Sequence, residues 1–453
     1  MPRQIRLNAF DMNCVGHIQH GMWAHPRDRS SSYTDLDHWV SLARTLEAGL
    51  FDGLFLADIL GVYDVFHDSP DASIRNAVQI PVNDPLLLIP AMAYATRNLG
   101  FGVTCNLTYE PPYTFARRMS TLDHLTKGRI GWNVVTGYLD SAARGMGLAQ
   151  QPEHDSRYDV AEEYMQVAYQ LWEGSWEDGA ALHDRDARIY ADPARIHRVK
   201  HDGQYYKVDA IHLSEPSPQR TPVLYQAGAS DRGRAFAAEH AECIFVNGQF
   251  RHNVRDIVGD IRAQANGFGR DPHDIKVFVG ATVVVAPTEA EAHDKLAEYR
   301  EYASSEGALA HYSASVGVDF SRYGPDEPIR FVKTNALRSN LEAITVRSGS
   351  EWTLRKLMNM MVLGSRQAPI VGSPVQVADQ MQAWVDEADV DGFNLSRTVI
   401  PECVQDFIAL VVPELQSRGL MKDRYGPGTL REKLFGPGRA RVPGTHPAAR
   451  FRR

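Results

Sequence analysis

The amino-acid sequence predicts an α/β protein that forms a single (β/α)8 barrel. Two observations predict this fold. Short apolar segments that end in polar residues alternate with segments of helical periodicity along the 453 residues, as strands and helices do in such barrels. The segment 130–135 is also flanked by glycine and interrupted only by Asn133, which is typical of a parallel strand covered on both faces.

The strands and helices can be placed in chain order. Strands are expected at residues 5–10, 51–57, 101–105, 130–135, 223–227, 242–246, 275–285 and 391–395. Helices, whose apolar residues recur at three- and four-residue spacing, are expected at residues 35–49, 86–98, 114–126, 158–173, 232–240, 253–267, 375–388 and 404–418. Each expected strand is therefore followed by a helix.

Two connections are too long for ordinary barrel loops. We expect insertions at about 139–222, after the fourth strand, and at about 288–371, after the seventh, within one domain spanning 1–453. The second insertion is expected to form a lid. The tail at 420–453 is expected to be extended, with its arginines (Arg439, Arg441, Arg450, Arg452, Arg453) packed on a neighbouring subunit or solvated.

Composition indicates a soluble, cytoplasmic protein. The net charge is −8, which argues against nucleic acid as a partner. No apolar segment approaches the roughly 20 residues that span a bilayer, and the N-terminal segment lacks the apolar core of a secretion signal. The four cysteines show no CxxC spacing and are expected to be reduced.

The chemistry of a (β/α)8 barrel gathers at the carboxyl ends of its strands. Polar residues at these ends are Cys14, His17, Asp58, Tyr63, Thr104, Asn133, Thr136, Tyr138, Gly228 to Ser230, and Asn394. Considered by itself, Asn133 could equally well form a hydrogen bond within the barrel core or contact a ligand. The other strand ends favour a ligand.

The turn Gly228-Ala229-Ser230 opens a helix, where free N–H groups and the helix dipole favour a phosphate. Tyr158 either adds a hydroxyl to this phosphate site or covers the barrel edge. The loop with Cys14, His17 and His20 lacks the pair spacing of a metal site, so no metal is expected. Glycosidase, GxSxG and HExxH patterns are absent from the sequence. The site therefore favours a phosphorylated planar cofactor.

Longer motifs resemble the bacterial-luciferase-like flavin monooxygenases. They are NAFDMNCVGH, FDGLFLADILGVYD, VQIPVNDPL, RRMSTLDHLTKGRIGWNVVT, EHDSRYD, LWEGSW, EPSPQRTPVLYQAGAS and REKLFG. The chain is most similar to the branch of the dimethyl sulfide, long-chain alkane, dibenzothiophene sulfone and nitrilotriacetate monooxygenases. This resemblance implies a two-component enzyme that takes reduced FMN from a separate NAD(P)H:flavin reductase, binds O2 and forms a flavin hydroperoxide.

The resemblance also implies roles for individual residues. Asp58, Thr104, Asn133 and Thr136 would hold the isoalloxazine, and Tyr158, Gly228, Ala229 and Ser230 the ribityl phosphate. Cys14, His17, Tyr63, Gln79, Tyr138 and His311 would form the catalytic, substrate-facing side. We expect His17 to lie over the N5/C4a edge of the flavin, with His311 arriving from the lid.

One departure concerns the substrate. The resembling alkane enzymes carry histidine where this chain has Tyr138, and the run TGYLDSAAR is closer to the dimethyl sulfide enzymes. This favours a small sulfide, with an alkane as the other favoured substrate. Oxidative cleavage of a heterocycle such as riboflavin, deazaflavin-dependent hydride transfer and a non-catalytic flavin-binding subunit are the alternatives. Relatives imply a homodimer or homotetramer.

Overall fold

Eight parallel strands form a closed ring in the computed structural model, which describes residues 3–228, 230–248, 250–329, 352–361, 363 and 368–453. In chain order they are β1 (Arg6–Met12), β2 (Gly53–Ala57), β3 (Gly100–Asn106), β4 (Ile130–Val135), β9 (Val223–Gln226), β10 (Cys243–Val246), β11 (Lys276–Val285) and β13 (Gly392–Ser396). Each pairs with the next, and β13 pairs with both β11 and β1, which closes the barrel. The predicted (β/α)8 fold is confirmed, and each predicted strand lies within two residues of its position.

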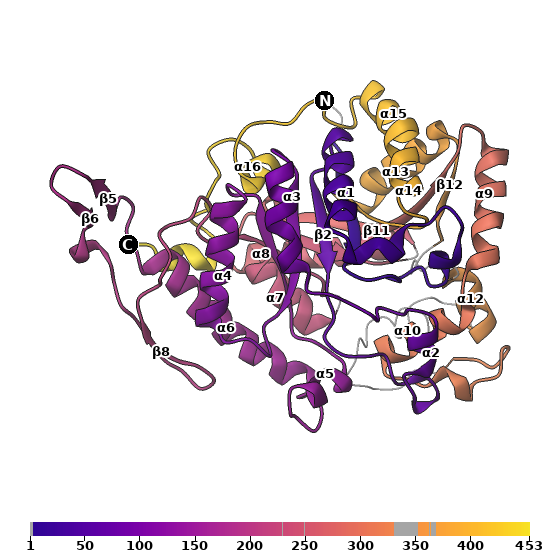
Figure 1. The fold of residues 1–453 in the computed structure, drawn as a ribbon, viewed down its shortest axis with the longest axis horizontal. Helices are drawn as coiled ribbons and strands as arrows, with labels where there is room; N and C mark the ends of the chain where they lie inside the picture. Colours follow the sequence, from indigo (N-terminus) through magenta and orange to yellow (C-terminus); the bar gives the residue numbers. More distant parts are fainter. Residues whose placement is uncertain (1–2, 229, 249, 330–351, 362, 364–367) are drawn as a thin grey trace.

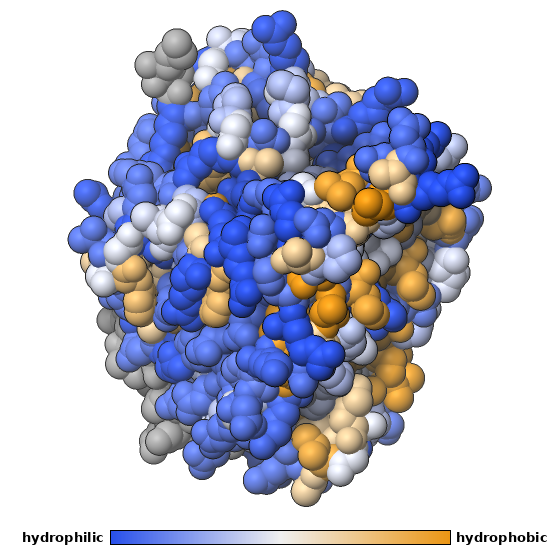
Figure 2. Space-filling model, turned by 90° about the vertical axis from the view of Figure 1, so that its left-hand side faces the viewer, coloured by the Kyte–Doolittle hydropathy of each residue, from blue (hydrophilic) through white to orange (hydrophobic). Residues whose placement is uncertain are grey.

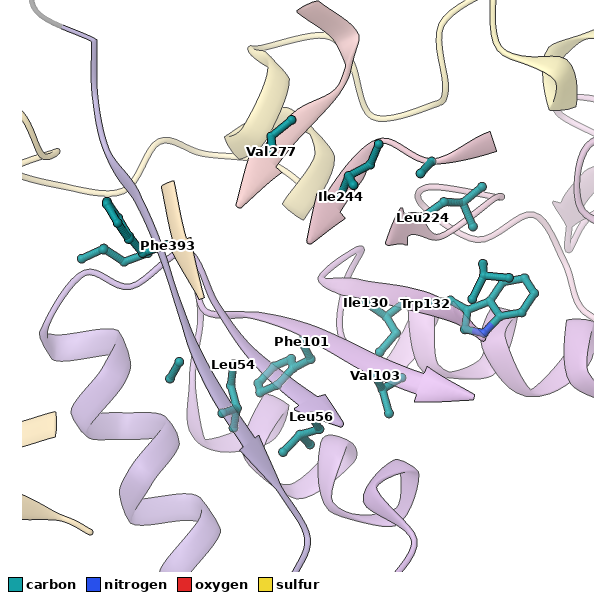
Figure 3. Packing of buried hydrophobic residues seen from close by; sticks show 14 of the residues in the cluster. Leu54, Leu56, Phe101, Val103, Ile130, Trp132, Leu224, Ile244, Val277 and Phe393 are labelled. Atoms are coloured by element: carbon teal, nitrogen blue, oxygen red, sulfur yellow. The ribbon is translucent and has the colours of Figure 1, made fainter. Parts of the chain in front are cut away.

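Alternation along the strands divides the core into two parts. Leu54 and Leu56 belong to the large cluster between the strands and the outer helices, together with Phe101 and Trp132 (Figure 3). Phe55, which lies between the two leucines, belongs to a separate cluster inside the ring. Its ring centroid lies 4.3 Å from that of Phe245. Successive side chains of a strand point to opposite faces, so a strand buried on both faces has a continuous apolar sequence.

Helices cover the outside of the ring (Figure 1). They are α1 (Leu36–Ala48), α3 (Ile89–Ala95), α4 (Pro112–Leu125), α6 (His154–Gly174), α7 (Asp231–His240), α8 (Arg251–Gly267) and α13 (Pro374–Ala388). The final predicted helix is α14 (Glu402–Asp406), a π-helical turn (Phe407–Val411) and α15 (Val412–Ser417). Local signals set the ends: Asp35 accepts a hydrogen bond from the N–H of Asp37, and Ser373 forms a capping box with Gln376.

Two hairpins occupy the polar segment between α6 and β9. They are β5 (Ala181–Asp184) with β6 (Ile189–Ala191), and β7 (Val199–Asp202) with β8 (Lys207–Ala210). Both project away from the barrel (Figure 1), on a face that is largely hydrophilic with hydrophobic residues gathered on one part of it (Figure 2). The same connection holds α5 (Asp140–Gly145), which precedes α6. The sequence indicated a turn-rich insertion here but not these hairpins.

Within the described residues, the connection between β11 and β13 contains α9 (Glu289–Tyr302), α10 (Ser305–Val316), α12 (Leu354–Met361) and β12 (Ile370–Gly372), a short strand that pairs with β11 and was not predicted. Residues of α10 and α12 lie at the carboxyl end of the barrel. Helix α10 packs on α2 (Asp71–Arg75), which lies in the loop after β2. The part of the expected lid at 330–351 lies outside the described residues.

The C-terminal tail covers the opposite end of the barrel with α16 (Leu430–Phe435), a helix that the sequence did not predict (Figure 1). Leu430 and Leu434 complete the apolar cluster inside the ring. Arg431 is 1% exposed, and its Nε lies 2.7 Å from Oε1 of Glu242. The amino-terminal mouth of the barrel is therefore closed by the chain itself.

The expectation for the tail arginines is wrong for three of them. Arg439 pairs with Asp274, and Arg441 and Arg452 both pair with the buried Glu173. A fully buried carboxylate needs cationic partners, and the tail supplies two from the same chain. Among the described residues, none of the helices combines the length and apolar character that crossing a membrane requires.

Candidate active site

A cavity of about 560 Å³ opens at the carboxyl ends of the barrel strands. It brings together most of the residues predicted from the sequence: His17, Asp58, Tyr63, Gln79, Thr104, Asn133, Thr136, Tyr138, Tyr158, Gly228 and His311. His17 and His311 are 294 positions apart in the sequence and share this cavity, because the loop after β1 and helix α10 both lie at the carboxyl end of the barrel.

Two of the predicted residues, Cys14 and Ser230, are not among those that line the cavity. Cys14 is fully buried beside the cavity rather than on its wall, and burial raises the pKa of its thiol to about 12. Ser230 lies at the start of α7, where its Oγ accepts a hydrogen bond from the N–H of Gly233. Ala229 lies outside the described residues. Cys14 is therefore not brought to the site as a reactive thiolate.

Three side-chain amides give the floor of the cavity its chemistry. Asn133 on β4 donates from Nδ2 to Oγ1 of Thr104 at 2.9 Å, because the two residues are register partners on adjacent strands. Among the described residues, the Oδ1 atoms of Asn133 and Asn394 and Oε1 of Gln226 are buried without a hydrogen-bond partner. Such atoms each cost roughly 1–3 kcal/mol unless a ligand pairs with them. The floor is therefore suited to a ligand that carries N–H or O–H donors.

Polar and cationic groups gather at the start of α7. Tyr158 and Arg157 of α6 line the cavity there together with His154, whose Nε2 lies 3.5 Å from Oγ of Ser230. A Cβ atom at Gly228 would come within 2.5 Å of Nε2 of Gln226, so glycine is required for this close turn. A helix N-terminus surrounded by hydroxyl, imidazole and guanidinium groups is suited to an anion.

A chain of hydrogen bonds crosses the wall near α2. Gln79 donates from Nε2 to the carbonyl of His17 at 2.7 Å, and its Oε1 accepts from the hydroxyl of Tyr63 at 2.8 Å. The hydroxyl oxygens of Tyr63 and Tyr138 lie 2.9 Å apart. Because the single hydroxyl proton of Tyr63 is donated to Gln79, Tyr138 is the donor in this contact. The backbone carbonyl of His17 thus fixes the donor and the acceptor in each hydrogen bond of this series.

Asp58 is the acidic group of this wall. Burial, and secondarily the nearby charge of Asp84, raises the pKa of its carboxyl to about 7. Both mechanisms disfavour the charged form. Near neutral pH the group therefore exists in both states and can donate or accept a hydrogen bond.

We expect Asp58→Asn to change the pH dependence of stability. Because the pKa of Asp58 is higher in the folded than in the unfolded chain, the wild type loses stability as pH rises from about 4 to about 7. The amide of the variant does not ionise and lacks this penalty. The free energy of unfolding of the variant should therefore exceed that of the wild type by about 2 kcal/mol at pH 8, and the two values should be equal near pH 4. Urea unfolding at both values measures the difference. As a control, Asp84→Asn removes the nearby charge, so the pH range over which the protein loses stability should shift to lower pH. If the free energies of unfolding of the wild type and Asp58→Asn change with pH in the same way, the raised pKa of Asp58 is contradicted.

The sequence analysis missed Arg397, which follows β13. Its Nε lies 3.0 Å from Oδ1 of Asp11, and both side chains are buried. Its Nη2 donates to the carbonyls of Cys14 and Val15 at 2.9 and 2.7 Å. Arg397 therefore fixes the loop that leads to His17. Its position directly after a strand, in the run NLSRT, was the signal available.

Comparison with known proteins shows what the chain is similar to. The family model described as luciferase-like monooxygenase matches residues 18–391, a span that contains most of the cavity lining. The match covers the barrel from the loop after β1 to the start of β13.

Three relatives match over nearly the whole chain. A long-chain alkane monooxygenase of Geobacillus thermodenitrificans is 52% identical, with 100% of this chain and 99% of the relative covered. A dimethyl-sulfide monooxygenase of Hyphomicrobium sulfonivorans is 48% identical, with 100% and 94% covered. Component A of nitrilotriacetate monooxygenase from Aminobacter aminovorans is 34% identical, with 93% and 94% covered.

Two solved structures share the fold over the full length of both chains. The crystal structure of a long-chain alkane monooxygenase has a TM-score of 0.93 at 51% identity, with 100% of each chain covered. A riboflavin lyase, solved with a modified FMN and its substrate riboflavin, has a TM-score of 0.94 at 36% identity, also with 100% of each chain covered.

Proposed function

Because the chain belongs to the luciferase-like monooxygenase family, we propose that it is a two-component, flavin-dependent enzyme. It uses reduced FMN from a separate NAD(P)H:flavin reductase, together with O2, to oxygenate a small organic substrate. The observation that carries the proposal is the set of buried amide oxygens without partners among the described residues of one cavity, which is also lined by hydroxyl, imidazole and guanidinium groups near the start of α7.

The residues present fit a flavin. A reduced isoalloxazine carries N–H groups on its ring edge, and the amide oxygens of Asn133, Gln226 and Asn394 offer acceptors for them. The phosphate would be held by Ser230 and Tyr158 at the start of α7. The glycine turn at Gly228 allows close approach of the backbone.

Reduced FMN would supply the electrons that reduce O2. The protein supplies the surroundings for this chemistry. The hydrogen-bonded chain from His17 to Tyr138 would orient the substrate against the flavin edge, and α10 would limit the access of water.

The lining supports an uncharged substrate. Among the described residues, the guanidinium groups that line the cavity belong to Arg157 and Arg234, and Arg234 pairs with Asp231 and Asp260 near the start of α7. The wall around Tyr63 and Tyr138 carries hydroxyl, amide and imidazole groups beside apolar residues. A small sulfide or an alkane fits this wall better than a polycarboxylate does, since buried carboxylates need cationic partners.

A separate reductase is supported by the similarity to a protein named as one component of a monooxygenase. Oxidative cleavage of riboflavin is a second candidate, supported by the full-length structural likeness to riboflavin lyase. The same cavity would serve both reactions.

The test is oxygen uptake with FMN, NADH and a generic flavin reductase. The substrates are dimethyl sulfide, a long-chain alkane, an aryl sulfone, an aminopolycarboxylate and riboflavin. Product formation with one of the first two, and little hydrogen peroxide, is the expected result. Turnover only with a deazaflavin would indicate hydride transfer. Flavin binding with peroxide as the sole product, whatever is added, would indicate either a substrate outside this set or a chain that binds flavin without using it.

We expect His17→Ala to uncouple the reaction. The imidazole of His17 lines the cavity, and its ring centroid lies 4.4 Å from that of Phe10. His17 is not among the residues expected to hold the isoalloxazine or the phosphate, so its loss should leave FMN affinity nearly unchanged. Product per turnover should fall roughly a hundredfold to a thousandfold, as for the loss of one oriented hydrogen-bonding group, and peroxide release should rise. His197→Ala, which removes a histidine paired with Glu177 in the hairpin segment, is the control. Unchanged product per turnover in His17→Ala would refute the role.

A further inference from the structure

A buried pair of histidines, His20 and His311, lies at the cavity wall. His20, in the loop after β1, places Nε2 at 2.9 Å from Nδ1 of His311 on α10. The ring centroids are 5.0 Å apart, with an interplanar angle of 77°. His311 lines the cavity and stacks on Tyr63, with 5.0 Å between the ring centroids. His20 is not among the residues that line the cavity. His20 therefore reaches the cavity only through His311.

The surroundings keep His20 in place and uncharged. Its side chain is 2% exposed, and burial lowers the pKa of the imidazole to about 3. Its carbonyl accepts a hydrogen bond from the N–H of Ser304 at 2.8 Å. A Cβ atom at Gly307 would come within 2.8 Å of Cβ of His20, so α10 packs directly against this residue. A neutral imidazole carries one ring proton.

The contacts decide which nitrogen of His20 holds that proton. Among the described residues, Nδ1 of His20 has no hydrogen-bond partner. A buried N–H without an acceptor is rarer in proteins than a buried acceptor without a donor. The proton therefore belongs on Nε2 and is donated to His311, whose Nδ1 must then be the acceptor. A neutral His311 consequently carries its own proton on Nε2.

We propose that His20 is a positioning residue that holds His311, a residue of the cavity lining, in the Nε2–H tautomer. The consequence for catalysis rests on the proposed monooxygenase function. Fixing the tautomer of a histidine through its second nitrogen is how orienting residues act in other sites.

The role of His20 resembles that of Gln79 in one respect. Gln79 sets the direction of the contact between Tyr63 and Tyr138 by accepting the proton of Tyr63. His20 sets the proton of His311 in the same way, through the contact between its Nε2 and Nδ1 of His311.

The test uses two substitutions of His20 and a matched control. His20→Phe keeps a ring of similar size without a donor, and His20→Gln keeps an N–H donor. His212→Phe removes another buried histidine, whose Nε2 contacts Oγ of Ser120 and which does not line the cavity. The tautomer is read by NMR of 15N-histidine-labelled, flavin-free protein, with the His311 signals assigned from their loss in His311→Phe.

In the wild type we expect the His311 proton on Nε2. In His20→Phe we expect a mixture of tautomers and a fall in product per turnover of roughly tenfold to a hundredfold, the range seen when an outer hydrogen-bonding partner is removed from a site. FMN affinity should not change. His20→Gln should restore both readouts, and His212→Phe should alter neither.

A wild-type His311 proton on Nδ1, or an unchanged His311 spectrum in His20→Phe, would overturn the proposal. The wild-type spectrum alone is decisive if His20→Phe does not fold. The spectrum is recorded without flavin or substrate, so absence of product with every substrate would count against the proposed substrates and leave the tautomer result standing.

Discussion

Replacing Arg397 with methionine should lower the free energy of unfolding by about 3–5 kcal/mol, the cost of leaving a buried charge without its partner. Arg397 neutralises Asp11, which is 2% exposed, and Asp28 contributes a second buried carboxylate to the same region. Methionine fills much of the volume but supplies neither charge nor donors. The carbonyls of Cys14 and Val15 would lose their hydrogen bonds as well.

Urea unfolding of the single and double variants distinguishes the contribution of the ion pair to the free energy of unfolding from the contribution of side-chain packing. In Asp11→Asn/Arg397→Met the uncompensated carboxylate is gone, so the double variant should be more stable than Arg397→Met alone. Because Arg397 fixes the loop leading to His17, the single variant should also release more peroxide per turnover. A loss of stability below about 1 kcal/mol, within the range of ordinary surface substitutions, would contradict the proposed clamp.

The Ser230→Asp variant should bind FMN at least roughly a hundredfold more weakly than the wild type, because a carboxylate at this position would repel a phosphate held at the start of α7. The design leaves the helix intact. The Ser230 side chain caps α7 by accepting from the N–H of Gly233, and aspartate is an equally good cap. Thermal stability should therefore remain close to that of the wild type.

Riboflavin provides the matched ligand for this experiment, since it has the isoalloxazine but not the phosphate. Titration by fluorescence quenching should show a large loss of FMN affinity and an unchanged affinity for riboflavin in Ser230→Asp. Ser230→Ala, which removes the cap without adding charge, should lose far less FMN affinity. Equal FMN affinity in Ser230→Asp and wild type would place the phosphate elsewhere.

The barrel was predictable because each strand and helix is indicated by a pattern of residues that are neighbours in the sequence. A parallel strand buried on both faces reads as a continuous apolar run, and a helix between two such strands has its own period, so β4 was placed at its exact bounds. The cavity lining followed from the same pattern, because the polar residue that ends each strand must lie at one edge of the ring. His17, Asp58 and Asn133 share a cavity for this reason.

The sequence by itself thus determined the fold, the edge at which the site lies and the family. Tertiary structure alone decided which polar groups meet. His20 contacts His311 across 291 positions, and Arg397 binds the carbonyl of Cys14 across 383. Cys14 is buried beside the cavity for the same reason: its surroundings come from distant segments. Strand and helix periods describe only neighbours along the chain, whereas these contacts depend on the closure of the barrel.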